Sequence, residues 1–205
     1  MNREKDLANS IGVSFLKTRP AGMPERSARQ RYCEFLGMAR RGKSFCVPAE
    51  SVTCPFARYY LGIAEADVKD LVEMMLSWGD VADRESGLRF LESMPRLEGA
   101  YRYIAFFPYS DGDSGAIEAD VIIKVGSPLK LQNYVRMYSS CTGERVSCSV
   151  SGMAAACGEC TAAVIKRNAP AVSVGCAGSR RGMALRDGEM LIAAPAGSKM
   201  FEVLK

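Results

Sequence analysis

Eight cysteines are the residues of this 205-residue chain that are best suited to chemistry. Cysteine thiolates act as nucleophiles and as ligands of soft metals and iron–sulfur clusters. Five of the eight lie between Met137 and Arg180, mainly at the turns between expected elements. The cysteines are therefore the starting point for a functional hypothesis.

Cys157 and Cys160 form a CxxC motif on an expected helix over residues 153–166. Residues i and i+3 of an α-helix lie on one face, so the two thiolates could share one metal or cluster. The motif lacks the aromatic residue and the proline of a thioredoxin-type redox pair. A zinc site would need a second close cysteine pair, and the sequence has none.

Cys54 directly precedes Pro55, which suits the first position of a helix. We therefore expect Cys54 to be an N-cap, where the positive end of the helix dipole favours the thiolate. Cysteine also packs in cores as a small hydrophobe. Cys46 and Cys148 lie inside expected strands, and we expect both of them to be core residues.

The segment 175–181, GCAGSRR, follows an expected strand. Its small residues could expose successive backbone N–H groups to an anion, with an arginine as the counter-charge. Its residue order is that of neither a P-loop nor a dinucleotide fingerprint. The alternative is a tight, solvent-exposed turn. The candidate binding residues are Gly175, Gly178, Ser179 and Arg180.

The composition excludes several classes of site. The chain has no histidine, which rules out Ser-His and Cys-His nucleophile pairs and imidazole ligands for zinc or haem. The acidic turn DGDSG (111–115) lacks the glutamate spacing of a calcium loop. Any metal is therefore expected to bind through cysteine, carboxylate or backbone groups.

Hydrophobic residues make up 48% of the chain and charged residues 24%, as in an ordinary soluble globular protein. The net charge of +4 favours an anionic partner only weakly, and no basic run typical of nucleic-acid binding is present. No apolar segment is long enough to span a membrane, and the N-terminus lacks a signal sequence. We expect a cytoplasmic protein with reduced thiols and neither a nucleic-acid nor a membrane partner.

Apolar periodicity and the positions of Gly and Pro predict an α/β or α+β fold in a single domain over residues 1–205. Strands are expected at 11–17, 43–47, 101–109, 117–125, 145–151, 171–175 and 189–195. Helices are expected at 28–40, from residue 55, and at 65–78, 86–94, 129–140, 153–166 and 198–205.

Two stretches, 38–54 and 137–157, each contain a helix end, a Gly, a strand with a Cys, and a second Cys that opens a helix. We interpret them as a weak duplication of two β-α-β-α-β halves, 11–109 and 117–205, around a pseudo-two-fold in a mixed sheet. Cys54 and Cys157 would then be equivalent and would face each other. The alternative is a coincidence of Gly and Cys positions.

The motifs RYCEFLGMARRG, TCPFARYYLG, ADVIIKVGSPLKLQ, VSVGCAGSR and GEMLIAAP occur in this order along almost the whole chain. In these motifs the chain resembles the family catalogued as domain of unknown function 169, found mostly in archaea and anaerobic bacteria. That family has no established activity. The cysteines that match its pattern are Cys33, Cys54, Cys157 and Cys176. Those particular to this chain are Cys46, Cys141, Cys148 and Cys160.

The resemblance implies that the four matching cysteines form a site, and an anaerobic setting would favour an oxygen-sensitive cluster. Our leading hypothesis is a [4Fe–4S] cluster on Cys33, Cys54, Cys157 and Cys176, with Cys160 as a possible substitute for one ligand. Its role would be electron transfer or a redox-accessory task with a redox partner protein. The alternatives are a cluster-free module that binds a small anionic ligand at 175–181, and a thiol enzyme that uses Cys54.

Overall fold

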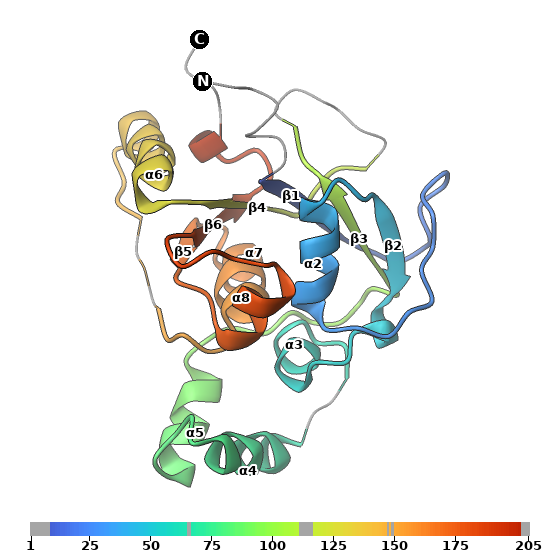
Figure 1. The fold of residues 1–205 in the computed structure, drawn as a ribbon, viewed down its shortest axis with the longest axis vertical. Helices are drawn as coiled ribbons and strands as arrows, with labels where there is room; N and C mark the ends of the chain where they lie inside the picture. The colour runs from blue at the N-terminus through green and yellow to red at the C-terminus, as the bar shows by residue number, and fades with distance from the viewer. Residues whose placement is uncertain (1–8, 65–66, 111–116, 147, 149, 202–205) are drawn as a thin grey trace.

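A six-stranded sheet with helices on both of its faces organises the chain in the computed structural model (Figure 1). The structure describes residues 9–64, 67–110, 117–146, 148 and 150–201. The strands are β1 (Ser10–Leu16), β2 (Phe45–Pro48), β3 (Tyr103–Pro108), β4 (Val121–Gly126), β5 (Ala171–Ser173) and β6 (Met190–Pro195). The α-helices are α2 (Tyr32–Arg40), α3 (Pro55–Tyr60), α4 (Val68–Trp78), α5 (Arg84–Glu92), α6 (Pro128–Thr142), α7 (Ala163–Arg167) and α8 (Ala177–Gly182).

Three short helices of other types complete the fold. Two are 3₁₀ turns, η1 (Ala49–Ser51) and η3 (Lys199–Phe201). The third, η2 (Ala155–Ala162), is a π-helix that runs directly into α7. The expected C-terminal helix is represented only by η3, because residues 202–205 lie outside the described part of the chain. The acidic turn DGDSG also lies outside it.

The strand order is β2-β3-β1-β4-β6-β5, and every pairing in this sheet is antiparallel. The expected single-domain α/β or α+β class is confirmed, but the expected mixed sheet is wrong. Strand direction depends on the side to which each connection returns, and residue patterns within a strand do not record it. The central pair, β1 and β4, joins the two halves of the chain through the pairing of Val13 with Val121.

The central strands are covered on both faces, which explains the unbroken apolar run of β4. Val121 and Ile123 belong to the large core beneath α2 and the π-helix, whereas Ile122 packs with Leu131 and Tyr138 of α6 on the other face. Successive side chains of a strand point to opposite faces. The sheet therefore has one face covered by several helices and a second face covered by α6 and η3.

The proposed duplication agrees with the strand order and disagrees with the helices. From the centre outwards, each half contributes its first, third and second strand in turn. A two-fold axis that relates antiparallel neighbours stands perpendicular to the sheet and keeps its two faces distinct. The helices that follow the first strands, α2 and α6, nevertheless cover opposite faces. The duplication therefore stays a prediction, limited to the strands.

Two local predictions are corrected by the structure. At the described positions of 145–151 the chain forms no strand, and Cys148 is exposed. An alternating pattern does not form a strand without a neighbouring edge on which to pair. The expected turn after β5 is the helix α8, which begins directly after Cys176. Cys46, in contrast, is fully buried in β2 as expected.

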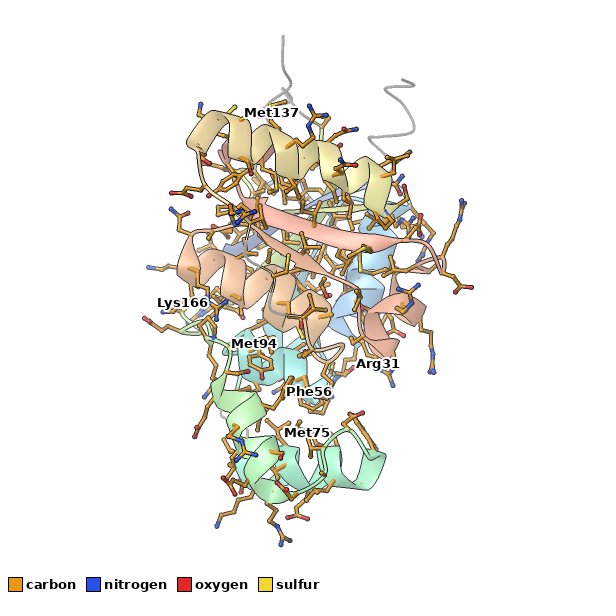
Figure 2. All side chains as sticks on the ribbon, turned by 90° about the vertical axis from the view of Figure 1, so that its left-hand side faces the viewer. Arg31, Phe56, Met75, Met94, Met137 and Lys166 are labelled. Atoms are coloured by element: carbon orange, nitrogen blue, oxygen red, sulfur yellow. The ribbon has the colours of Figure 1, made fainter. Side chains whose placement is uncertain are left out.

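Helices α4 and α5 project from the body of the molecule below α3 (Figures 1 and 2). The Asp67 side chain caps α4 by accepting a hydrogen bond from the Lys69 N–H, and Gly79 ends the helix at φ 73°. Fully buried Met75 faces the core residue Phe56 of α3 (Figure 2). No helix in the described part of the chain combines the length and apolar character needed to span a membrane.

Candidate functional site

Cys33 and Cys176 face each other across the contact between α2 and α8. Cys33 is the second residue of α2, and its thiol donates a hydrogen bond to the Gly178 carbonyl at 3.1 Å. Cys176 is the N-cap of α8, and its sulfur accepts from the Ser179 N–H at 3.4 Å. A Cβ at Gly178 would lie 3.9 Å from each sulfur. The two sulfurs are therefore separated by at most twice that distance.

Cys54 and Cys157 approach the same place from two further helices. Cys54 is the N-cap of α3, as predicted, but its side chain accepts no capping hydrogen bond from the described residues. The nearby main-chain N–H groups of Ala57 and Phe56 favour a lower pKa of its thiol. Cys157 is the third residue of the π-helix, against which α3 packs. Its Sγ lies 3.7 Å from the Ala154 carbonyl oxygen.

Burial and neighbouring thiols raise the pKa of Cys33 and of Cys157. Burial is the main cause that raises the pKa of Cys33 to about 12, and Cys54 and Cys176 raise it further. Burial also raises the pKa of Cys157 well above its ordinary value, and Cys54, Cys176 and Cys33 add to this effect. Electrostatic influence falls with distance, so the four predicted cysteines lie in one neighbourhood.

The site is mostly closed to solvent, and each thiol lies in or directly before the first turn of a helix. Cys33 and Cys157 are 8% and 7% exposed, whereas Cys54 and Cys176 are half-buried. The four cysteines come from different parts of the chain, yet α2, α3, the π-helix and α8 place them on one face of the sheet (Figure 1). Solvent therefore reaches the site past Cys54 and Cys176.

The four thiols are not arranged as the ligands of a single metal ion. Among the described residues, no three Cys, Asp or Glu side chains are grouped closely enough to hold one. A [4Fe–4S] cluster takes four cysteine thiolates as its ligands. The raised pKa values of Cys33, Cys54 and Cys157 mean that a metal would have to displace their protons.

Cys160 does not face the same groups as Cys157, although the two form the CxxC motif. Burial raises the pKa of Cys160, and the other contributions come from Glu159, Cys176 and Cys148. The expected alignment on one face assumed α-helical winding, whereas this segment is a π-helix with wider turns. Cys160 therefore lies at the edge of the four-cysteine group, towards the Cys176 side.

The segment 175–181 uses many of its polar groups internally. Gly175 adopts φ +83°, and its N–H donates to the Ser173 hydroxyl at 3.1 Å. The Cys176 N–H donates to the hydroxyl of the buried Ser179 at 2.8 Å. Gly178 lies beside the sulfurs of Cys33 and Cys176. Of the predicted anion-binding residues, Gly178 and Ser179 therefore contact the cysteine site directly.

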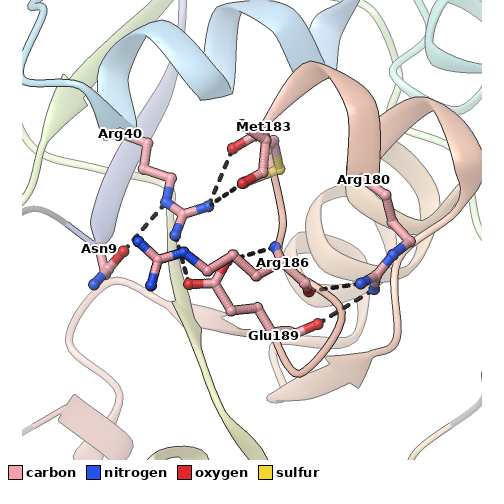
Figure 3. A network of polar contacts seen from close by, with 7 residues as sticks. Asn9, Arg40, Arg180, Met183, Arg186 and Glu189 are labelled. Atoms are coloured by element: carbon pink, nitrogen blue, oxygen red, sulfur yellow. Dashed lines mark hydrogen bonds and ion pairs between the residues drawn. The ribbon is translucent and has the colours of Figure 1, made fainter.

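The Arg180 side chain lies on main-chain carbonyls instead of facing the thiols. Its guanidinium donates to the carbonyl oxygen of Val174 at 2.8 Å. It also donates to those of Arg186 at 2.6 Å and Glu189 at 3.3 Å (Figure 3). These bonds fasten the loop after α8 to the end of β5. The expected use of Arg180 as the counter-charge of an anion stays a prediction.

Two buried polar arrangements near the site were missed by the sequence analysis. The Glu159 carboxylate is 3% exposed and accepts from the N–H and hydroxyl of Ser151 and from the Ser173 hydroxyl. Arg40, at the end of α2, pairs with Glu189 at 2.8 Å and also donates to main-chain oxygens after α8 (Figure 3). Arg40 and Glu189 are far apart in the chain, and the partners of Glu159 lie in other segments than the π-helix, so no pattern within one element indicates these contacts.

The π-helix also depends on a contact between distant residues. The Thr161 hydroxyl donates to the Ala156 carbonyl five residues earlier, at 2.7 Å, and lies 3.0 Å from the Tyr32 hydroxyl of α2. Ala154, at the start of the helix, has φ 47°, which is uncommon for a residue with a side chain. π-Helical turns are rare and often occur at functional sites. Here the turn presents Cys157 to α2 and α3.

Comparison with known proteins agrees with the resemblance seen in the motifs. An uncharacterised protein of Methanocaldococcus jannaschii is 25% identical over 191 residues, which cover 90% of this chain and 81% of that protein. No solved structure matches the chain. Residues 8–204 match the family of domain of unknown function 169, described as uncharacterised ArCR. The chain therefore belongs to the family of domain of unknown function 169.

Proposed function

We propose that the protein binds a [4Fe–4S] cluster through Cys33, Cys54, Cys157 and Cys176 and serves in electron transfer or a related redox task. The observation that carries this proposal is the convergence of four cysteines from four separate helices on one largely buried site. Cysteines that only fill a core have no reason to gather. A cluster, when bound, would supply a reversible one-electron couple.

The main-chain donors around the sulfurs support an anionic group. A cluster held by four thiolates is negative, and burying that charge is costly unless donors face it. The Ser179 N–H already bonds to the Cys176 sulfur, and the N–H groups of Ala57 and Phe56 lie near that of Cys54. Hydrogen bonds to cluster sulfurs also tune the reduction potential.

The alternative of a thiol enzyme is less well supported. A nucleophilic cysteine needs a lowered pKa, usually from a nearby cation or base. Burial raises the pKa of Cys54, and neither the nearby N–H groups nor Arg31 reverses this direction. Cys54 is therefore better suited to lose its proton to a metal than to attack a substrate.

Anaerobic preparation with iron and sulfide tests the proposal. We expect a broad absorption band near ~400 nm and about four irons and four sulfides per chain, as for Cys₄ clusters. The control is a Cys46→Ser variant, because Cys46 is equally buried but lies in β2 outside the site. Colourless, iron-free wild-type protein after reconstitution would contradict the proposal. If the wild-type protein binds iron but the Cys46→Ser control does not, a loss of iron in a cysteine variant reports on folding and not on the site.

A further inference from the structure

Positive charge is concentrated in the segment that leads into the cysteine site. Residues 17–43 contain eight lysines and arginines against two glutamates, whereas the whole chain has a net charge of only +4. The rest of the chain is therefore slightly acidic. The segment runs past β2 and then forms α2, whose second residue is Cys33 (Figure 1). Within it, Arg29, Arg31, Arg41 and Lys43 are exposed.

A groove follows the outer side of α2, where this helix packs on α8. Its volume is about 380 Å³, and its lining residues are Gln30, Glu34, Met38, Arg41, Arg181 and Gly182. Glu34 and Met38 lie four residues apart on one side of α2, and Gln30 precedes the N-cap of this helix. Arg41 and Arg181 are exposed at its rim. The buried Gln30 Oε1 has no hydrogen-bond partner among the described residues.

The groove lies directly above the cysteine site. A Cβ at Gly182, which lines the groove, would come within 2.9 Å of the Cys33 sulfur. Arg31, at the end of the groove, is close enough to Cys54 to lower the pKa of its thiol. Beside Cys176, Val174 is 42% exposed. The accessible side of the site thus combines a small apolar contact with surrounding cations.

We infer that this basic groove is the docking surface for an acidic electron-transfer protein. The inference rests on the proposed cluster and names the chemistry of its partner. Redox partners form small, short-lived interfaces that are guided by complementary charge, which raises the association rate and weakens with salt. Gly182 of the groove lies against Cys33, and Arg31 lies near Cys54, so a partner guided by the cations of this surface would dock next to the proposed cluster.

Binding of a small acidic ferredoxin, measured by titration calorimetry at low and high salt, tests the inference on the whole chain. The variant carries Arg29→Glu, Arg41→Glu and Arg181→Glu, while Arg31 is kept so that the surroundings of Cys54 do not change. The matched control carries Lys69→Glu, Arg102→Glu and Arg136→Glu, three exposed cations outside the groove. Both variants change the net charge equally.

We expect the groove variant to bind at least ~10-fold more weakly at low salt, the control to stay within ~3-fold of wild type, and salt to weaken wild-type binding. Equal losses in both variants, no binding at all, or tighter groove-dependent binding of a short DNA duplex would overturn the inference. Iron content is measured separately. Protein without iron that still binds through the groove would refute the cluster and leave the docking surface standing.

Discussion

Both faces of the sheet are covered by helices, but only one of them gathers thiols. On the first face, four helices place Cys33, Cys54, Cys157 and Cys176 at or next to their first turns. On the second face, Cys141 lies near the end of α6, is exposed, and has its sulfur 3.9 Å from the Met137 sulfur. The candidate ligands therefore lie at the starts of helices, whereas the exposed Cys141 lies near the end of one.

The two faces also differ in the ionisable groups that they bury, which are a lysine ammonium on the second face and thiols on the first. On the second face, Lys124 is 5% exposed, and its ammonium lies 4.7 Å and 4.8 Å from the ring centroids of Tyr134 and Phe201. Its charge is thus enclosed partly by aromatic packing. On the first face, buried thiols lie beside one another and raise each other's pKa. The raised pKa values keep these thiols protonated and neutral at ordinary pH.

The largest expected effect comes from removing single thiols on the first face. We expect Cys54→Ser and Cys157→Ser each to abolish cluster loading, because a hydroxyl is a poor ligand for iron in a cluster. Cys141→Ser and Cys148→Ser, which change exposed cysteines, should load like wild type. The measurement is iron and sulfide per chain after anaerobic reconstitution. Equal iron content in all four variants would remove the ligand assignment.

The contact between α2 and α8 provides the next test. A methyl group at Gly37 would come within 2.1 Å of the Gly182 main-chain oxygen, so Gly37→Ala must push the two helices apart. We expect a loss of about 3 kcal/mol in the free energy of unfolding, together with weaker iron binding. Denaturant unfolding measures the first effect. Gly188→Ala is the control, because its new methyl group would meet no atom within 4 Å.

If Gly37→Ala proves as stable as that control, the close packing of α2 on α8 is wrong.

A matched loss of stability on the second face should leave the site intact. Leu131 of α6 is 4% exposed and packs on Ile122, so Leu131→Ala should cost about 2–3 kcal/mol. Iron per chain should nevertheless stay at the wild-type value below the unfolding transition. A parallel fall in iron would show that loading reports only on overall stability.

The smallest expected effect is the alkaline pH dependence of the iron-free protein. The pKa of Cys33 is about 12 in the folded chain against an ordinary 9.0, so its contribution to stability is complete below pH 9 and is lost as the pH rises towards 12. In that window one thiol contributes a slope of about 1.4 kcal/mol per pH unit. Cys33→Ala should reduce the slope, as measured by anaerobic urea unfolding between pH 8 and 11. An unchanged slope would contradict the burial of Cys33.

Local patterns predict the local parts of this site. Pro55 indicates the start of α3 and therefore the capping position of Cys54, which the structure confirms. The antiparallel sheet and the π-helix depend on contacts between distant residues, such as that between Tyr32 and Thr161, and no local pattern records them. Helix α8 was expected to be a turn because its sequence is rich in small residues. The hydrogen bonds between Cys176 and Ser179 nevertheless begin a helix there.

The convergence of the four cysteines was indicated by the family motifs and not by the spacing of the residues. The spacing pointed to the CxxC pair, which the π-helix separates. The predicted equivalence of Cys54 and Cys157 also relied on a strand at 145–151 that does not form at its described positions. The two cysteines still approach each other, because α3 packs on the π-helix.

Anomalous diffraction at the iron edge, from crystals grown anaerobically after reconstitution, would show directly which sulfurs hold the metal. We expect iron density about 2.3 Å from the sulfurs of Cys33, Cys54, Cys157 and Cys176, by analogy with other metal–thiolate bonds. Density at Cys160 in place of one of them would change the ligand set and keep the cluster. Iron bound elsewhere on the chain, or no iron in crystals of a fully folded protein, would contradict the assignment of this site.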